Sequence, residues 1–401
     1  MSENVKYWLW LQSALGAGAP INSVVDDFGG AKELYESNII EWKMSPSLTA
    51  RQINRLEETD LNSVESTIYS CEQNGWQIID FEDERYPKNL REIYNPPAVL
   101  YVDGELPDLD GIVSIGIVGT RKASEYAIKT TQIMSRGITE AGALVVSGGA
   151  VGVDSAAHRG AIMAGGKTIA VLGCGFGTNY LMKNAALRDM IKRNGALVTE
   201  YPPFVTASKF TFPQRNRIIS GLSLGILVVE AGVSSGSLIT ASHAAEQGRD
   251  IFAIPASVLD VKYHGTNKLI EDGAYVATSP ESILSVYRDR YPSLDMSKVR
   301  SIEELMYDST DRSANTDKSE DYTAFEKLDE GRAKRSEKEE KASSLTGDLK
   351  TVYLALSENF EHIDEIINGA DLPGNRVTAA LMQLELMGLA ESASGKRYKL
   401  S

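Results

Sequence analysis

The stretch that decides the fold is Ile115–Asp154, IGIVGTRKASEYAIKTTQIMSRGITEAGALVVSGGAVGVD. An apolar run over 115–118 stops at Gly119-Thr120-Arg121, and a second run over 143–146 stops at Ser147-Gly148-Gly149. A helix-like segment lies between the runs, and another begins after the second. Buried strands that end in small residues before a helix are typical of a doubly wound α/β domain, which binds ligands at the carboxyl ends of its strands.

Two interpretations of these turns stay open at this point. Glycines let a backbone approach a ligand closely, and helix N-termini offer free N–H groups to anions, so the turns would form a phosphate-binding edge that contains Arg121. Alternatively, the glycines only satisfy the backbone geometry of ordinary turns between strands and helices.

Length and composition indicate a globular protein of two or three domains, with 401 residues. No run of 18 apolar residues occurs, so we expect no membrane span. The apolar segment 7–19 imitates a signal peptide, but the spacing of Trp8, Leu11 and Leu15 favours an amphipathic first helix. The two cysteines, Cys71 and Cys174, give no disulfide framework, which fits the reducing cytoplasm.

Charge is distributed unevenly along the chain. The formal net charge is −14, yet the segment 155–225 holds nine lysines and arginines against two acidic residues. A basic segment inside an acidic chain is a better guide to an anionic partner than the overall charge. The alternative is that these side chains are solvated on helix faces.

The order of the elements predicts an α/β protein with an extended Rossmann-like, mostly parallel sheet. We expect four parts: a helical domain over 1–75 that is similar to a SAM or helix-hairpin-helix domain, the Rossmann-like domain over 76–290, a charged flexible linker over 291–345, and a winged helix over 346–401. Strands are expected at 76–80, 98–102, 115–118, 143–146, 168–172, 196–199, 225–229, 250–254 and 275–276.

The C-terminal part shows three helix patterns followed by a hairpin around Gly395, which is typical of a winged helix. Wings often bind DNA, but 346–401 carries five basic and eight acidic residues, and Arg376 is the one cation of the third helix. Duplex binding and a protein-contact or regulatory role both stay open.

The strongest chemical signal is Phe210–Ser223, FTFPQRNRIISGLS. Arg215 and Arg217 flank Asn216 before an apolar helix. The guanidinium group of arginine can donate two parallel hydrogen bonds to phosphate oxygens, and the asparagine amide can hydrogen-bond a base edge or a sugar. Phe212 is a candidate for stacking on a base. An arginine pair that only bridges structure is the alternative.

Two further turns are weaker candidates. Ser235 and Gly236 follow a buried strand and open a helix, so they either hold an anion or cap that helix. Glu230 would repel phosphate, which suggests that it orders the loop or orients a cation. Lys183 and Asn184 follow Gly173-Cys174-Gly175, and Lys183 is a plausible phosphate contact.

Several kinds of chemistry lack support in the sequence. Residues 161–168 resemble a P-loop but precede their strand instead of following it, so we expect no ATPase. The histidines show no metal spacing, and Asp154 is interpreted as a helix-start residue. We therefore expect no catalytic residue, no cofactor and no metal.

At Gly119–Arg121, Ser147–Asp154, Phe212–Ser223 and Ser235–Ala241 the sequence resembles the DprA/Smf family of DNA-processing proteins of natural transformation. The resemblance implies a homodimeric, non-catalytic protein that binds single-stranded DNA, protects incoming DNA and loads the recombinase RecA in the cytoplasm. It implies a pocket in which Arg121, Arg215, Asn216 and Arg217 meet the strand, and in which Gly148 and Gly149 approach it closely.

The candidate DNA-binding residues are Thr120, Arg121, Ser147, Gly148, Gly149, Lys183, Asn184, Phe212, Arg215, Asn216, Arg217, Ser235 and Gly236. Two other functions are considered. A Rossmann-type nucleotide phosphoribohydrolase shares such turns, although its Pro-Gly-Gly-x-Gly-Thr-x-x-Glu signature is absent. The second alternative function is that of a structural adaptor that acts through the winged helix.

Overall fold

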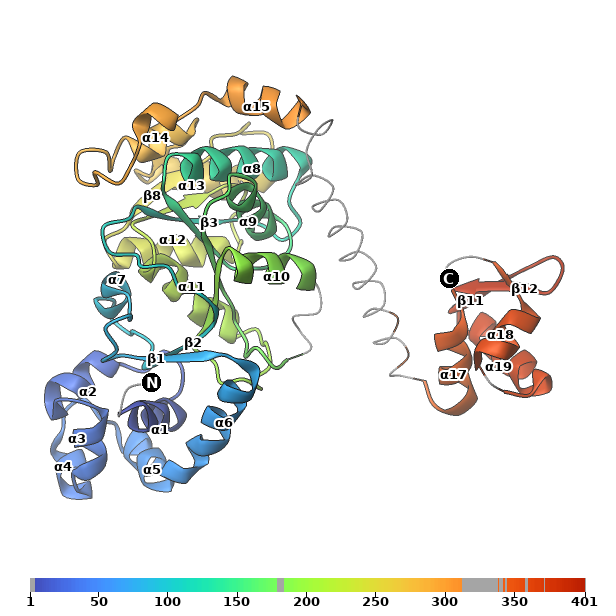
Figure 1. The fold of residues 1–401 in the computed structure, drawn as a ribbon, viewed down its shortest axis with the longest axis horizontal. Helices are drawn as coiled ribbons and strands as arrows, with labels where there is room; N and C mark the ends of the chain where they lie inside the picture. Colours follow the sequence, from blue (N-terminus) through green and yellow to red (C-terminus); the bar gives the residue numbers. More distant parts are fainter. Residues whose placement is uncertain are drawn as a thin grey trace. The chain divides into compact units, whose positions relative to one another are not determined.

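The computed structural model describes residues 4–178, 184–311, 338, 342, 345–357, 360–370 and 372–400. The chain divides into two compact units, Met1–Phe325 and Glu326–Ser401. The first unit holds a helical cluster, a large sheet and the helices that cover it (Figure 1). Among the helices that the structure describes, none combines the length and apolar character needed to span a membrane.

The N-terminal cluster consists of short helices because glycine, proline and capping residues interrupt the apolar pattern. Asn38 and Thr49 each begin a helix with a capping box. Gly16 and Gly18 take positive φ angles of 83° and 76° in the turn after the first helix. The helices are α1 (Val5–Leu15), α2 (Ile21–Phe28), α3 (Ala31–Glu36), α4 (Ile39–Met44), α5 (Ala50–Glu58), the 3₁₀ turn η1 (Leu61–Val64) and α6 (Glu65–Asn74).

The sheet has nine strands within the described residues, in the order β1-β2-β6-β5-β4-β3-β7-β8-β9. The run from β6 to β9 is parallel, whereas β2 pairs antiparallel with β1 and β6. The expected α/β fold with a mostly parallel sheet is confirmed. The strands are β1 (Gln77–Asp80), β2 (Val99–Gly104), β3 (Ser114–Val118), β4 (Leu144–Ser147), β5 (Thr168–Val171), β6 (Gly195–Thr199), β7 (Gly225–Val228), β8 (Asp250–Ala253) and β9 (Tyr275–Val276).

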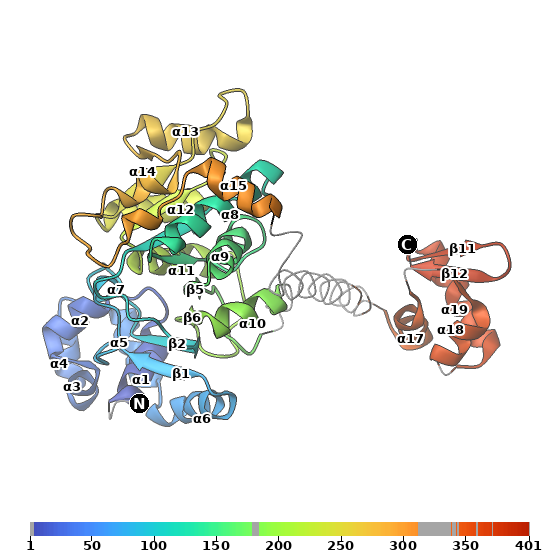
Figure 2. The same ribbon diagram turned by 45° about the horizontal axis from the view of Figure 1, so that its top comes forward.

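Helices cover both faces of the sheet, so the central strands are buried on both sides. Ile115 and Ile117 of β3 face the layer of α8, α9 and α14, whereas Val118 faces the layer of α11 and α12. The connecting helices are α7 (Lys88–Arg91), α8 (Glu125–Glu140), α9 (Val153–Met163), α10 (Ala185–Arg193), α11 (Thr211–Gly221), α12 (Ser237–Glu246), α13 (His264–Glu271) after the turn η3 (Val261–Tyr263), and α14 (Pro280–Leu284). Figure 2 shows α8 and α9 beside one another, and α12 near α11.

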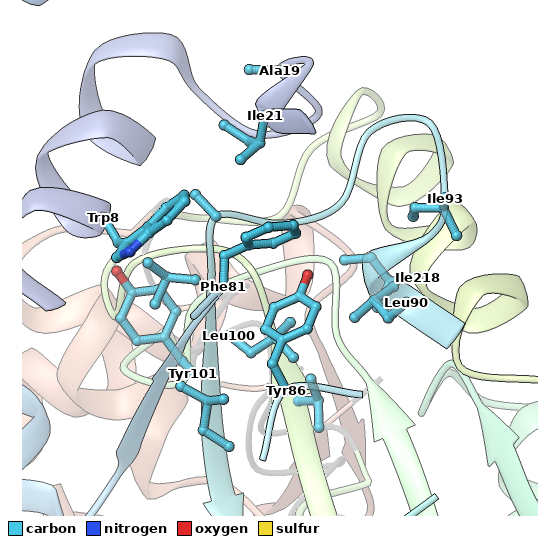
Figure 3. Packing of buried hydrophobic residues seen from close by; sticks show 14 of the residues in the cluster. Trp8, Ala19, Ile21, Phe81, Tyr86, Leu90, Ile93, Leu100, Tyr101 and Ile218 are labelled. Atoms are coloured by element: carbon cyan, nitrogen blue, oxygen red, sulfur yellow. The ribbon is translucent and has the colours of Figure 1, made fainter. Parts of the chain in front are cut away.

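The N-terminal cluster packs directly onto the sheet. Trp8 of α1 lies beside Tyr101 of β2, and its ring is 5.4 Å from that of Phe81 (Figure 3). Leu90 and Ile218, which belong to α7 and α11, come together in the same cluster. The first helices and the central sheet therefore share one hydrophobic core, although the sequence suggests separate domains over 1–75 and 76–290.

The expected linker over 291–345 begins with ordered structure. The turn η4 (Met296–Lys298) and the helix α15 (Ile302–Asp311) continue the first unit. Leu305 is fully buried and packs closely against Gly137 of α8, where an added Cβ would lie 3.0 Å from the leucine side chain. Leu294 and Met296 pack on the same layer. A few well-spaced apolar residues are enough here because they dock on a preformed surface, an effect that overall composition does not reveal.

The second unit has the three helices and the hairpin of a winged helix, as the sequence predicts. A two-residue strand, β10, joins that hairpin and has no counterpart in the predicted elements. The elements are α17 (Gly347–Ala355), β10 (Glu361–His362), α18 (Ile363–Ala370), α19 (Gly374–Leu386), β11 (Ala390–Ala393) and β12 (Arg397–Leu400), with the strand order β10-β12-β11.

Candidate nucleic-acid interface

A hollow of about 370 Å³ opens at the carboxyl ends of β3 and β7. The chain leaves β3 toward β4 on one side and returns to β7 on the other, so this is the topological switch point of the sheet, where α/β proteins bind ligands. The hollow is lined by Val118, Gly119, Thr120, Arg121, Ala150, Asp154, Phe212, Pro213, Arg215, Asn216, Ile219, Ser235, Gly236, Ser237, Ile239 and Thr240.

The first turns of three helices contribute to this lining. Asp154 lies in the first turn of α9, Phe212 in that of α11, and Ser237 begins α12. Each helix N-terminus carries a partial positive charge and free N–H groups. Three such ends around one hollow favour an anionic ligand.

Arg121 is the most accessible cation of the hollow. Its side chain is exposed, and its guanidinium lies over the Phe212 ring, 4.5 Å from the centroid. Gly173 also lies against Phe212, because a Cβ at that position would be 3.0 Å from the ring. Phe212 is therefore a platform that holds Arg121 at the mouth of the hollow.

A carboxylate fixes the loop that carries Arg121. Glu230 Oε2 accepts hydrogen bonds from the backbone N–H and the hydroxyl of Ser124, and from the hydroxyl of Tyr263 at 2.9 Å. The backbone N–H of Thr120 donates to the carbonyl of Glu230 at 2.9 Å. Glu230 thus orders the loop, in agreement with the sequence interpretation, and its charge is turned toward donors of its own chain.

Arg215 lines the hollow from a buried position. Its Nη1 donates to the carbonyl of Gly148 at 2.6 Å and to that of Val171. A Cβ at position 148 would overlap both this guanidinium and the carboxylate of Asp154. Gly148 is therefore needed to admit these two side chains.

Asp154 places a carboxyl group beside Arg215. Burial raises the pKa of Asp154, and the positive charge of Arg215 opposes this effect. The Asp154 carboxylate also accepts a hydrogen bond from the backbone N–H of Ala150 at 3.3 Å. It therefore ties the β4 loop to the start of α9.

Arg217 lies away from the hollow. Its Nη2 donates to Oε2 of Glu200 at 2.5 Å, and both side chains are buried. This is the bridging arrangement that the sequence leaves open for the arginine pair. Arg217 and Arg215 are both inside α11, which begins at Thr211, earlier than the sequence suggests.

Asn216 and the β7 loop close the other side of the hollow. The amide of Asn216 donates to the carbonyl of Gly236 at 3.3 Å. The hydroxyls of Ser235 and Ser237 are 2.8 Å apart. These groups are half-exposed or exposed at positions 216, 235 and 236, so they remain accessible to a ligand.

The thirteen candidate residues divide into three groups. Seven line the hollow: Thr120, Arg121, Phe212, Arg215, Asn216, Ser235 and Gly236. Five are described but are not among its lining residues: Ser147, Gly148, Gly149, Asn184 and Arg217. Lys183 is outside the described residues.

The non-lining candidates have evident structural partners. The Ser147 hydroxyl donates to the carbonyl of Ile117 at 2.6 Å. Gly149 takes a φ of 68° in the turn before α9. The Asn184 amide donates to the hydroxyl of Ser155 at 2.8 Å.

Sequence reasoning missed two residues of α12, Ile239 and Thr240, as part of the site. Ile239 and Thr240 line the hollow because they follow Ser235 and Gly236 by one helical turn. A spacing of three or four residues from those candidates is the signal that would have found them. Across the parts of the chain that the structure covers, no group of three His, Cys, Asp or Glu side chains is placed to hold a metal ion.

The winged helix offers a different surface. Arg376 of α19 is held by both carboxylate oxygens of Asp348, through Nε at 2.6 Å and Nη2 at 2.5 Å. Met382 and Leu386, one turn apart on α19, are exposed. The outer face of this helix therefore presents apolar groups where a duplex-reading helix presents cations.

The molecule is thus an α/β protein with a hollow at the switch point of its sheet, lined by arginines and helix N-termini, and with a separate winged helix. The chain belongs to the DprA/Smf family. A family model described as DNA recombination-mediator protein A matches residues 77–288, and one described as the DprA winged helix domain matches 336–396.

Relatives and a solved structure agree with this assignment. Protein Smf from a Synechocystis species is 35% identical over 82% of this chain and 81% of its own length. DNA processing protein DprA from Bacillus subtilis is 41% identical over 54% of this chain and 73% of its own length. The X-ray structure of DprA from Streptococcus pneumoniae has a TM-score of 0.61 and 33% identity, and covers 71% of this chain and 98% of that chain.

Proposed function

We propose that the hollow between β3 and β7 binds the sugar-phosphate backbone of single-stranded DNA. The observation that carries the proposal is the convergence of an exposed Arg121 with the first turns of α9, α11 and α12. Phosphate oxygens satisfy the free N–H groups of such helix ends and pair with the guanidinium. The basic segment that the sequence singled out supplies Phe212, Arg215 and Asn216 to this lining.

A single strand suits this site better than a duplex. The hollow is a crevice formed by loops and by the first turns of three helices. A flexible strand can bend its phosphates into a crevice, whereas a duplex presents them on a stiff rod. Affinity comes mainly from phosphate neutralisation and is therefore salt-dependent.

The proposed role in the cell is DNA processing during transformation. The Bacillus subtilis relative carries the name DNA processing protein DprA, and the matching family model is described as DNA recombination-mediator protein A. In this proposal the protein holds incoming single strands in the cytoplasm, protects them and passes them to RecA. It binds the strand without cleaving it.

We also propose that the protein acts as a homodimer. The edge strand β9 has two residues, and both side chains, Tyr275 and Val276, are about half exposed. An unpaired, partly apolar sheet edge is a surface that a second copy can cover. The mass of the full chain in solution, with Val276→Lys as the interface variant, tests this part separately.

The central experiment measures the binding of fluorescent oligo-dT and of a duplex of equal length to the full chain, by anisotropy. The expected result is tight, salt-dependent binding of the single strand and weaker binding of the duplex. Equal or stronger duplex binding would contradict the proposal. Electrophoresis of the labelled strand after incubation with Mg²⁺ checks that it stays intact.

A further inference from the structure

Four aliphatic side chains stand exposed on two loops beside the hollow. Val233 is 74% exposed, Val258 76%, Leu259 89% and Val261 68%. Apolar groups gathered at one place on a surface usually mark a binding site, because exposure to water costs free energy that a ligand can recover. We call these four residues the aliphatic rim.

The two loops lie next to each other because their strands do. β7 and β8 are parallel neighbours, so the loops that follow them leave the same edge of the sheet. The backbone N–H of Gly265 donates to the carbonyl of Ala231 at 2.8 Å, and a Cβ at Gly232 would lie 3.5 Å from the carbonyl oxygen of Val261. Val233 precedes Ser235 of the hollow by two residues, so the rim continues the hollow toward β8.

Side-chain hydrogen bonds order the loop that carries Val258, Leu259 and Val261. Asn267 bonds both the N–H and the carbonyl of Ala256, at 3.2 and 3.1 Å. The side chain of Asp260 accepts from the N–H of Lys262 at 3.0 Å. The hydroxyl of Tyr263 reaches Glu230, which also orders the Arg121 loop. The aliphatic groups therefore face solvent on an ordered loop that is coupled to the hollow.

We propose that the aliphatic rim packs against the nucleobases of the single strand whose phosphates occupy the hollow; this inference rests on the proposed function. When phosphates point into the crevice, the bases point outward, and a strand that continues from β7 toward β8 brings them over the rim. Valine and leucine contact any base face without reading its edge, which suits a protein that accepts any sequence.

A protein partner fits these observations less well. Standard protein interfaces take about 20–30 residues from each side, whereas the rim consists of four side chains on two loops. The loop also carries both Asp260 and Lys262, so it has no charge of one sign that would attract an oppositely charged surface. Its continuity with the hollow favours the strand.

The test uses the full chain and two ligands of equal length: oligo-dT, and an abasic strand that keeps the phosphates but lacks the bases. The variant is Val258→Ser/Leu259→Ser. Since both side chains are exposed, the fold tolerates the change. We expect binding of oligo-dT to weaken about three- to tenfold, with binding of the abasic strand and the salt dependence unchanged.

Leu386→Ser is the matched control, because Leu386 is 88% exposed and lies in the winged helix. The inference is overturned if the rim variant binds oligo-dT normally, if it loses both ligands equally, or if the control weakens binding as much. It is also overturned if the variant instead changes the mass of the protein in solution, which would assign the rim to self-association.

The proposed function fails on a different result. If the unchanged protein does not bind oligo-dT, or if Arg121→Ala leaves that binding intact, the hollow is not the strand site. If Arg121→Ala weakens binding and the rim variant does not, the hollow stands and the assignment of the rim alone is wrong.

Discussion

Arg217 and Glu200 form a buried ion pair in which Nη2 lies 2.5 Å from Oε2. Glu200 follows β6, and Arg217 lies inside α11, so the pair joins the sheet to the helix that carries Phe212 and Arg215. Its surroundings come from the N-terminal cluster: the amide of Gln12 donates to the carbonyl of Glu200 at 2.6 Å. The pair is a structural junction behind the site.

Arg217→Met is expected to lower the free energy of unfolding by about 3–5 kcal/mol, because it leaves a buried carboxylate without its partner. Burial raises the pKa of Glu200 in the folded protein. The variant should therefore keep its stability at a pH below the pKa of Glu200 in the unfolded chain. Its free energy of unfolding should fall as the pH rises, because the buried carboxyl group of Glu200 must then ionise without a partner. Urea denaturation at pH 5 and pH 8 measures this, and an equal loss at both would contradict it. Arg217→Met/Glu200→Leu should recover most of the stability.

Arg121→Ala should weaken oligo-dT binding about tenfold or more, because a charge-assisted contact is lost. The slope of log K against log salt should fall by about 0.7, the value for one phosphate contact on a single strand. The fold should be unaffected, since the side chain is exposed. Titrations at several salt concentrations measure both effects.

Arg288→Ala is the control for that variant. It removes the same charge from an exposed arginine near the amino ends of the strands, whereas the hollow lies at their carboxyl ends. The neighbouring Tyr287 bonds Asp250 at the start of β8. An equal loss of binding in the two variants would indicate a general effect of charge and not a site at Arg121.

Phe212→Leu tests the platform under Arg121. The variant keeps an apolar side chain in α11 but removes the ring that faces the guanidinium at 4.5 Å. We expect binding to weaken about two- to fivefold, the size of an exposed cation–π contact. Phe212→Tyr keeps the ring and should bind as the unchanged protein does; a weak Tyr variant would argue against this role.

Gly148→Ala should both destabilise the fold and weaken binding. The added Cβ overlaps Arg215 and Asp154, and displacing packed groups costs about 1–3 kcal/mol. Thermal melting and oligo-dT binding are the measurements. Gly369→Ala is the control, because a Cβ there meets only Ala355 at an ordinary 3.7 Å. An unchanged melting temperature for Gly148→Ala would contradict the packing around Arg215.

His158 gives a pH dependence of stability. Burial lowers its pKa to about 3, and its Nδ1 lies 2.8 Å from the Thr168 hydroxyl. In the unfolded chain a histidine takes up a proton near pH 6.5, whereas His158 in the folded protein stays neutral. Acid therefore favours unfolding, and this residue should lower the free energy of unfolding by about 2 kcal/mol as the pH drops from 7 to 5. His158→Asn should remove that part of the slope, whereas His243→Asn, on the surface of α12, should not.

The strands of the sheet were predictable because burial on both faces leaves a continuous β-branched run in the sequence. The strands β3 to β8 fall within one or two residues of the expected bounds. β10 was not predictable, since two residues at 361–362 become a strand only by pairing with β12. The helix α15 depends in the same way on a surface made by a distant part of the chain.

For the site, the sequence could indicate which loops meet but not which side chains face inward. Arg215 and Arg217 are two positions apart in α11, so their side chains point about 200° apart and only one can reach the hollow. The basic segment also overstated the free charge: Lys192 pairs with Asp103, and Arg217 with Glu200. Such partners are visible only in three dimensions.

The turn at Gly16–Gly18 has a consequence for how this protein can be divided. A Cβ at Gly18 would lie 3.3 Å from the side chain of Gln214, which precedes Arg215 in α11. A fragment that starts at β1 would expose Glu200 and the apolar faces of β2 and α11 to water. The N-terminal helices therefore form one structural unit with the domain that contains the proposed DNA-binding hollow. A deletion that removes them should give a fragment that aggregates and does not bind DNA.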